Sequence, residues 1–179
     1  MNQAGAIKTT RRTAFGSGRV HQVTLPAKAR ELTTLSQVDY EDAFLVDTGR
    51  HRERMPEQWA RATLEDAPLV WRSALPLGWL ALGLQLGPDR PEQSVLGWEV
   101  RRSTSEYALL GRKSRLGMPA ELLFKRHGDA LLFSTLVQHE NAIARAAWAR
   151  IAPPHRRVVR HLLGHAADPS RGIDGKPPL

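Results

Sequence analysis

Two histidines and one aspartate occupy positions from which they could perform acid–base chemistry. His139 ends an alternating segment, 130–139, and His155 falls within an apolar stripe further along the chain. Asp42, in a second alternating segment, 39–47, is the candidate partner carboxylate. A histidine carries a proton near neutral pH or orients a ligand by hydrogen bonding. The plainer alternative is that both histidines are satisfied core side chains and that Asp42 faces water.

Metal, serine and thiol chemistry are less favoured. His161 and His165 have the spacing of a two-histidine metal site on a helix, but arginines adjoin them and no glutamate lies between them. We interpret the pair as a solvated helix end and expect neither a metal nor another cofactor. No serine lies in a GxSxG motif, and the chain has no cysteine. Glu99 and Glu121 belong to alternating segments, so we expect both carboxylates to point outward.

Residues 129–166 must position both histidines, and we interpret them as a long strand leading directly into a helix. Alternate residues of 130–139 share one face and end at His139, while the opposite set turns polar toward water. Asn141 is suited to cap a helix over 141–165. Pro153 and Pro154 remove two backbone donors and predict a kink or restart. Before the prolines, the expected apolar stripe comprises Ile143, Ala144, Ala147, Trp148 and Ile151.

The remaining segments predict an antiparallel sheet with two helices inserted. Expected strands are a short edge strand at 19–26, a first core strand at 39–47, and later strands at 94–102, 105–112 and 118–126. His127-Gly128-Asp129 predicts a hairpin turn. One helix should begin at Pro56 and bury Trp59, Ala60 and Leu64. A second, capped by Asp66, should be broken by Pro76 and Gly78 and lie buried against the sheet through the uncharged run 74–84.

Composition is typical of a single soluble domain. The 179 residues are 41% hydrophobic and 25% charged, which suits one core. We place a disordered basic arm at 1–18, the domain at 19–166 and a disordered tail at 167–179. Six of the net eight positive charges lie in residues 1–30, so the basic excess belongs to an arm and nucleic-acid binding is not expected.

Location is predicted from what the sequence lacks. It contains no cysteine, its first residues include no apolar signal-peptide core, and no run reaches the roughly 18 apolar residues of a membrane span. These features favour the cytoplasm.

Three short motifs resemble one protein superfamily. They are YEDAFLV at 40–46, LGW at 96–98, and the spacing from Asn141 to PPHRRVV at 153–159. With the final strand and helix, they resemble the START-like or polyketide cyclase (SRPBCC) superfamily, in particular a bacterial family of uncharacterised domains within it. The resemblance implies an α+β helix-grip-like fold, in which a curved antiparallel sheet wraps a long C-terminal helix and encloses an apolar cavity. It implies no particular reaction.

We therefore expect the protein to bind a lipophilic small molecule in such a cavity, with His139 and His155 orienting the ligand. The walls would be formed by Trp71, Trp98, Phe124, Phe133 and Trp148. One alternative is a cyclase- or hydratase-like enzyme using these histidines with Asp42, although we lean away from catalysis. Another is a module that binds a protein partner or, weakly, a membrane surface through residues 1–30 or 74–86. The sequence predicts no oligomeric state.

Overall fold

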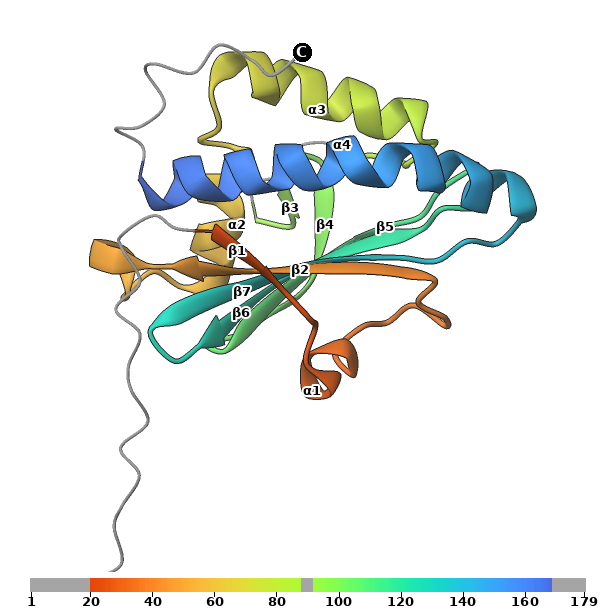
Figure 1. The fold of residues 1–179 in the computed structure, drawn as a ribbon. Helices are drawn as coiled ribbons and strands as arrows, with labels where there is room; N and C mark the ends of the chain where they lie inside the picture. Colours follow the sequence, from red (N-terminus) through yellow and green to blue (C-terminus); the bar gives the residue numbers. More distant parts are fainter. Residues whose placement is uncertain (1–19, 88–91, 169–179) are drawn as a thin grey trace, which may run out of the picture.

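An antiparallel sheet with helices on one face forms the part of the chain that the structure describes, residues 20–87 and 92–168 (Figure 1). The structure is a computed structural model. The predicted arm at 1–18 and most of the predicted tail lie outside the described residues. Within them the sheet has seven strands in the order β1-β2-β7-β6-β5-β4-β3, and each adjacent pair is antiparallel. The expected α+β class with an antiparallel sheet and a long C-terminal helix is confirmed.

The strands are β1 Val20–Val23, β2 Tyr40–Asp47, β3 Ser94–Val95, β4 Trp98–Ser103, β5 Tyr107–Arg112, β6 Ala120–His127 and β7 Ala130–Val137. The helices are α1 Ala27–Arg30, α2 Pro56–Leu64, α3 Leu69–Ala81 and α4 Ala142–Ala167, with a short 3-10 turn at Gly49–His51.

The centre of the sheet follows the sequence pattern closely. β1 is the predicted edge strand, and β2 is the predicted first core strand beside β7. His127 pairs with Ala130 across the predicted hairpin turn, where Gly128 has a φ of 61°. Residues 94–103 differ from the single strand expected there. Leu96 and Gly97 both have positive φ, so the chain reverses between β3 and β4.

Helix α4 begins as predicted, because the Asn141 side chain accepts a hydrogen bond of 2.8 Å from the backbone N–H of Ala144. Of the predicted kink or restart at Pro153, the restart is wrong, since α4 is one continuous helix in which both prolines face solvent. Its buried row is also displaced from the expected stripe. Ala144, Trp148 and Ala152 pack inward, whereas Ile143 is 82% exposed.

Helix α2 starts at Pro56 and buries Trp59, Ala60 and Leu64, as expected. The predictions for the next helix are wrong. Pro68, and not Asp66, precedes the first turn of α3, which continues unbroken through Pro76. No residue of α3 is fully buried. In Figure 1 it lies alongside α4 instead of on the sheet. The sheet face on the helical side already packs against α2 and α4, which leaves α3 in an outer position.

The second face of the sheet is also covered, by α1 and the segment that follows it. Its core includes Leu25, Ala29, Ala43, Leu109, Leu123, Leu132 and Leu136. On this face of β7, Leu132, Ser134 and Leu136 are buried, and the predicted polar end reaches solvent just beyond the strand, at the exposed Glu140. Glu121 points to this same face and was expected in solvent. It has no exposed surface and is held by Arg101, Thr33 and Thr34.

Candidate functional site

The structure brings two of the three candidate catalytic side chains into contact between β2 and α4. His155 Nε2 lies 3.4 Å from Asp42 Oδ2 and 3.1 Å from Thr135 Oγ1. The second oxygen of Asp42 accepts a hydrogen bond of 3.3 Å from the backbone N–H of Thr135. Asp42 is only 4% exposed, so the expectation that its carboxylate faces water is wrong. A buried carboxylate in this position fixes the orientation of the imidazole.

Tyr40 and Arg156 extend this pair, and neither was predicted as a site residue. Tyr40 donates a hydrogen bond of 2.8 Å to Asp42 Oδ2, and Arg156 Nη1 donates one of 3.4 Å to the Tyr40 hydroxyl. Burial, reinforced by the charge of Asp42 and the hydrogen bond to it, raises the pKa of Tyr40 well above its usual range. Tyr40 is therefore a neutral donor. Its position two residues before Asp42, on the same strand face, is the sequence signal that could have identified it.

His139 stands apart from the pair, with Trp148 between them. The Trp148 ring lies 5.4 Å from the His155 ring and 6.4 Å from the His139 ring, measured between centroids, and its edge contact with Tyr40 is 5.1 Å. Burial lowers the pKa of His139. Its Nε2 and the Trp148 Nε1 are both buried without a hydrogen-bond partner in the described part of the chain. His139 is thus a half-buried neighbour of Trp148 and makes no contact with Asp42.

An apolar pocket opens beside His155 and has a volume of about 40 Å³. It extends from the three helices to the sheet, where Leu122 and Phe133 form its floor. The complete lining is Thr63 and Leu64 of α2, Leu75 and Trp79 of α3, Leu122, Phe133, and His155, Val158, Val159 and Leu162 of α4. Among the residues predicted to line a ligand cavity, Phe133 and His155 do so.

The other predicted wall residues fill space in the interior or at its boundary. Phe124 packs edge-to-face on Phe133 at 5.0 Å, and Trp98 on Trp79 at 5.4 Å. Trp71 lies at the junction of α3 and α4, 5.5 Å from the ring of His161. Large aromatic side chains pack against one another when nothing separates them. Their number in the sequence could not show whether they surround a cavity or fill it.

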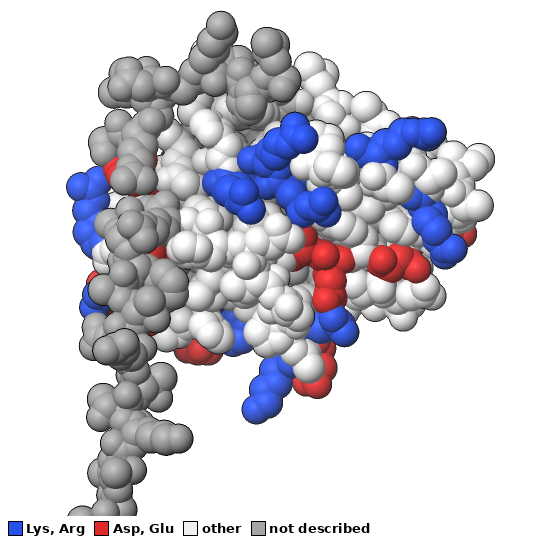
Figure 2. Space-filling model, in the orientation of Figure 1, with Lys and Arg blue, Asp and Glu red and all other residues white. Residues whose placement is uncertain are grey.

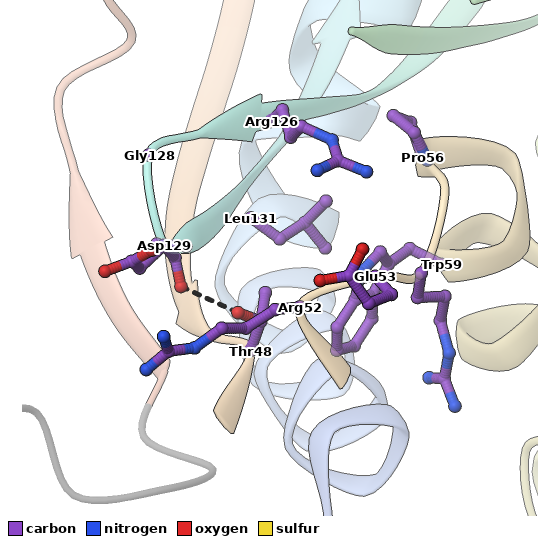
Figure 3. Close-up of a pocket in the computed structure, with 11 residues that line it drawn as sticks. Thr48, Arg52, Glu53, Pro56, Trp59, Arg126, Gly128, Asp129 and Leu131 are labelled. Atoms are coloured by element: carbon purple, nitrogen blue, oxygen red, sulfur yellow. Dashed lines mark hydrogen bonds between the residues drawn. The ribbon is translucent and has the colours of Figure 1, made fainter. Parts of the chain in front are cut away.

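A larger and polar hollow lies beside the β6–β7 turn (Figure 3). Its volume is about 270 Å³. Arg126 and Glu53 project into it from opposite sides, and the Thr48 hydroxyl donates a hydrogen bond of 2.6 Å to the Asp129 carbonyl at its edge. The Arg54 guanidinium instead lies over the Trp59 ring, with its Cζ atom 4.7 Å from the ring centroid. With charges of both signs and no predicted site residue, this hollow is the weaker candidate.

The structure also places His161 and His165. His161 is exposed, and His165 is half-buried near the end of α4. Among residues 20–87 and 92–168, no group of three or more histidine or acidic side chains could hold a metal ion. No helix in the same residues is long and apolar enough to cross a membrane.

Comparison of the chain with protein-family models, curated proteins and solved structures found no match.

Proposed function

We propose that the protein binds a lipophilic small molecule between the sheet, α2, α3 and α4, in a helix-grip-like arrangement. The observation that carries the proposal is the apolar pocket bounded by His155, whose ring is held by the buried Asp42. Apolar walls with a few fixed polar groups are typical of sites for such ligands. The resemblance of the sequence to the START-like superfamily supports the same function.

The size of the pocket requires α3 to move when a ligand enters. Pockets for drug-sized ligands measure roughly 300–1,000 Å³, far more than the 40 Å³ present here. Helix α3 is the element able to move, because it contacts the core only through partly buried side chains, Leu75 and Trp79 among them. Elements with few buried contacts open at low free-energy cost. We therefore assign α3 the role of a lid over the pocket.

In the open state, the pair at the pocket wall provides a polar anchor. The Nε2 atom of His155 faces Thr135 and Asp42, so Nδ1 is the ring nitrogen on which a ligand hydroxyl or carbonyl could form a hydrogen bond. The apolar part of the ligand would then lie along Leu122 and Phe133.

The same pair supports a second candidate, an enzyme of the cyclase or hydratase type. A histidine oriented by a buried carboxylate is the usual arrangement of a general base, and the separation of 3.4 Å between His155 and Asp42 fits it. Asp42 would position the imidazole, and His155 would exchange the proton with a substrate in the pocket. Binding alone needs only a hydrogen bond at this position, so the two functions make different demands on His155.

Titration with the neutral apolar dye N-phenyl-1-naphthylamine tests the proposal. Val158 lines the pocket, and Val158→Phe should weaken dye binding about tenfold, equivalent to 1.4 kcal/mol, while the melting temperature is retained. Ile143→Phe is the matched control, because it changes an exposed β-branched residue of the same helix and should bind like the wild type. Equal affinity of both variants, or loss of folding with Val158→Phe, would refute the pocket.

His155→Gln separates the two functions. Gln keeps hydrogen-bonding capacity but transfers no proton near neutral pH, so a binding protein should keep its dye affinity. Native mass spectrometry of the purified protein should reveal a copurified lipophile. If that compound is converted by the wild type and still bound but not converted by His155→Gln, the enzyme is the correct function.

A further inference from the structure

Helix α3 is apolar on two opposite sides. At about 100° per residue, Trp71, Leu75 and Trp79 gather on the side facing α4 and the core. The opposite side carries four large apolar side chains within an arc of about 100°. They are Leu69, Val70, Leu77 and Leu80, each 55% to 75% exposed.

A helix with apolar residues on opposite sides is normally buried on both of them. These four residues are half of the eight exposed large hydrophobic residues in the described part of the chain. Concentration on one helix distinguishes them from the single exposed apolar residues common on any surface, and it marks an interaction site.

The charged residues within the α3 and α4 segments all have one sign. Residues 67–87 and 141–167, which contain α3 and α4, include no acidic residue and no lysine. They hold six arginines: Arg72, Arg145, Arg150, Arg156, Arg157 and Arg160. Figure 2 shows blue side chains gathered over α4, with the red ones in view mostly below them, toward the sheet. Arg150 and Arg157 are exposed on the solvent side of α4.

We propose that α3 and the adjacent arginines of α4 dock on a membrane surface rich in anionic phospholipid. Leu69, Val70, Leu77 and Leu80 would enter the boundary between headgroups and acyl chains, with α3 lying in the plane of the membrane. Arg150 and Arg157 would contact lipid phosphates. This combination of an apolar helix face and flanking arginines is the pattern of interfacial helices.

Charge favours a lipid surface over a second copy of the chain. A symmetric dimer through α3 brings the same surface patch of each copy together, so the arginines of α4 would approach one another without acidic partners from 67–87 or 141–167. A nucleic acid would satisfy the arginines and leave the four apolar residues in water. An anionic bilayer satisfies both.

This inference goes beyond ligand binding and does not depend on it. The inner side of α3 closes the pocket, and its outer side docks. A lipophile could then pass between membrane and pocket when α3 shifts.

Co-sedimentation of the full chain with vesicles tests the docking surface. Vesicles of phosphatidylcholine containing about 30 mol% phosphatidylglycerol should retain the protein, and pure phosphatidylcholine vesicles should retain little. Leu77→Glu and Leu80→Glu should each release most of the bound protein, as should Arg150→Gln combined with Arg157→Gln. Val23→Glu introduces the same charge at an exposed apolar residue of the edge strand β1, outside α3 and α4, and should bind like the wild type.

The basic N-terminal segment is present in every variant, so it cannot produce a difference between them. If Leu77→Glu and Val23→Glu bind equally, the attraction arises elsewhere and the proposal is wrong. The proposal is also overturned if the wild-type protein does not co-sediment with anionic vesicles. A dimer seen by light scattering that Leu77→Glu dissociates would overturn it as well. Thermal unfolding followed by circular dichroism confirms that each variant is folded. Unchanged dye binding by Leu77→Glu would separate docking from the pocket.

Discussion

Glu121 shows at the scale of a single residue why strand alternation predicts direction better than burial. Its side chain does point away from the face that α4 covers. Its surroundings come from distant parts of the chain, since Thr33 and the backbone N–H of Thr34 donate hydrogen bonds to it and Arg101 pairs with it. No spacing within β6 indicates that residues nearly ninety positions earlier cover this carboxylate. A buried charge requires such partners.

Glu121→Ala should therefore destabilise the protein strongly. Removing one partner of a buried ion pair typically costs about 3–5 kcal/mol, because Arg101 and the two threonine donors lose their acceptor. Urea unfolding of this variant should show a large fall in the midpoint. Glu41→Ala, which removes an ion pair with the exposed Arg30, should change the midpoint little.

The combination Glu121→Ala with Arg101→Ala should recover part of the loss, since no unpaired arginine remains. Equal midpoints for the Glu121 and Glu41 variants would show that the buried pair contributes no more than a surface pair.

The same distinction applies to Asp42 and His155. The sequence identified both as candidates, His155 because it falls in an apolar stripe and Asp42 as the partner carboxylate in an alternating strand, and the structure places them in contact. Tyr40 was missed because its phenol reads as one more apolar residue in an alternating strand. The aromatic residues were correctly expected inside, but whether an interior is hollow depends on packing across several elements.

At the scale of the element, α4 shows which signals are local. Its start was predictable because Asn141 and Ala144 are neighbours in sequence and their hydrogen bond closes within one turn. Its continuation through Pro153 was not, because Trp148 and Ala152 before the prolines and Val159 and Leu163 after them pack on one core. Tertiary packing thus keeps one helix where the backbone alone favours a break.

Asn141→Ala should reduce the free energy of unfolding by about 1 kcal/mol, the usual value of a helix N-cap. The loss arises because the backbone N–H of Ala144 is left without an acceptor. Asn141→Asp is the control, since its carboxylate still accepts this hydrogen bond and favours the positive end of the helix dipole. Urea unfolding should rank the wild type and the Asp variant above the Ala variant. If Ala equals Asp, the side chain is not stabilising α4.

At the scale of the whole molecule, the layer occupied by each helix decided which predictions failed. Most of the strands, the β6–β7 hairpin and the start of the final helix follow from local patterns, and so does the α+β class. The position of α3 does not. Its composition favours burial, yet α2 and α4 already occupy the helical side of the sheet. Whether an apolar helix packs on the sheet depends on which other helices already cover it, and local sequence does not contain this information.

The exposed position of α3 predicts how the protein opens. An element without a fully buried residue unfolds or detaches more readily than the core, and α3 contains none. Hydrogen exchange followed by mass spectrometry should therefore show faster exchange in residues 69–81 than in α4 or in β2, β6 and β7. Addition of vesicles containing phosphatidylglycerol should slow exchange in 69–81 and leave β6 unchanged, because docking covers α3 and the solvent side of α4 and does not reach the sheet. The Leu77→Glu variant should keep the fast exchange of α3 with vesicles present. Exchange in α3 as slow as that in α4 in the free protein would mean that α3 is a fixed part of the core, and then neither the lid nor the entry of a lipophile beneath it is tenable.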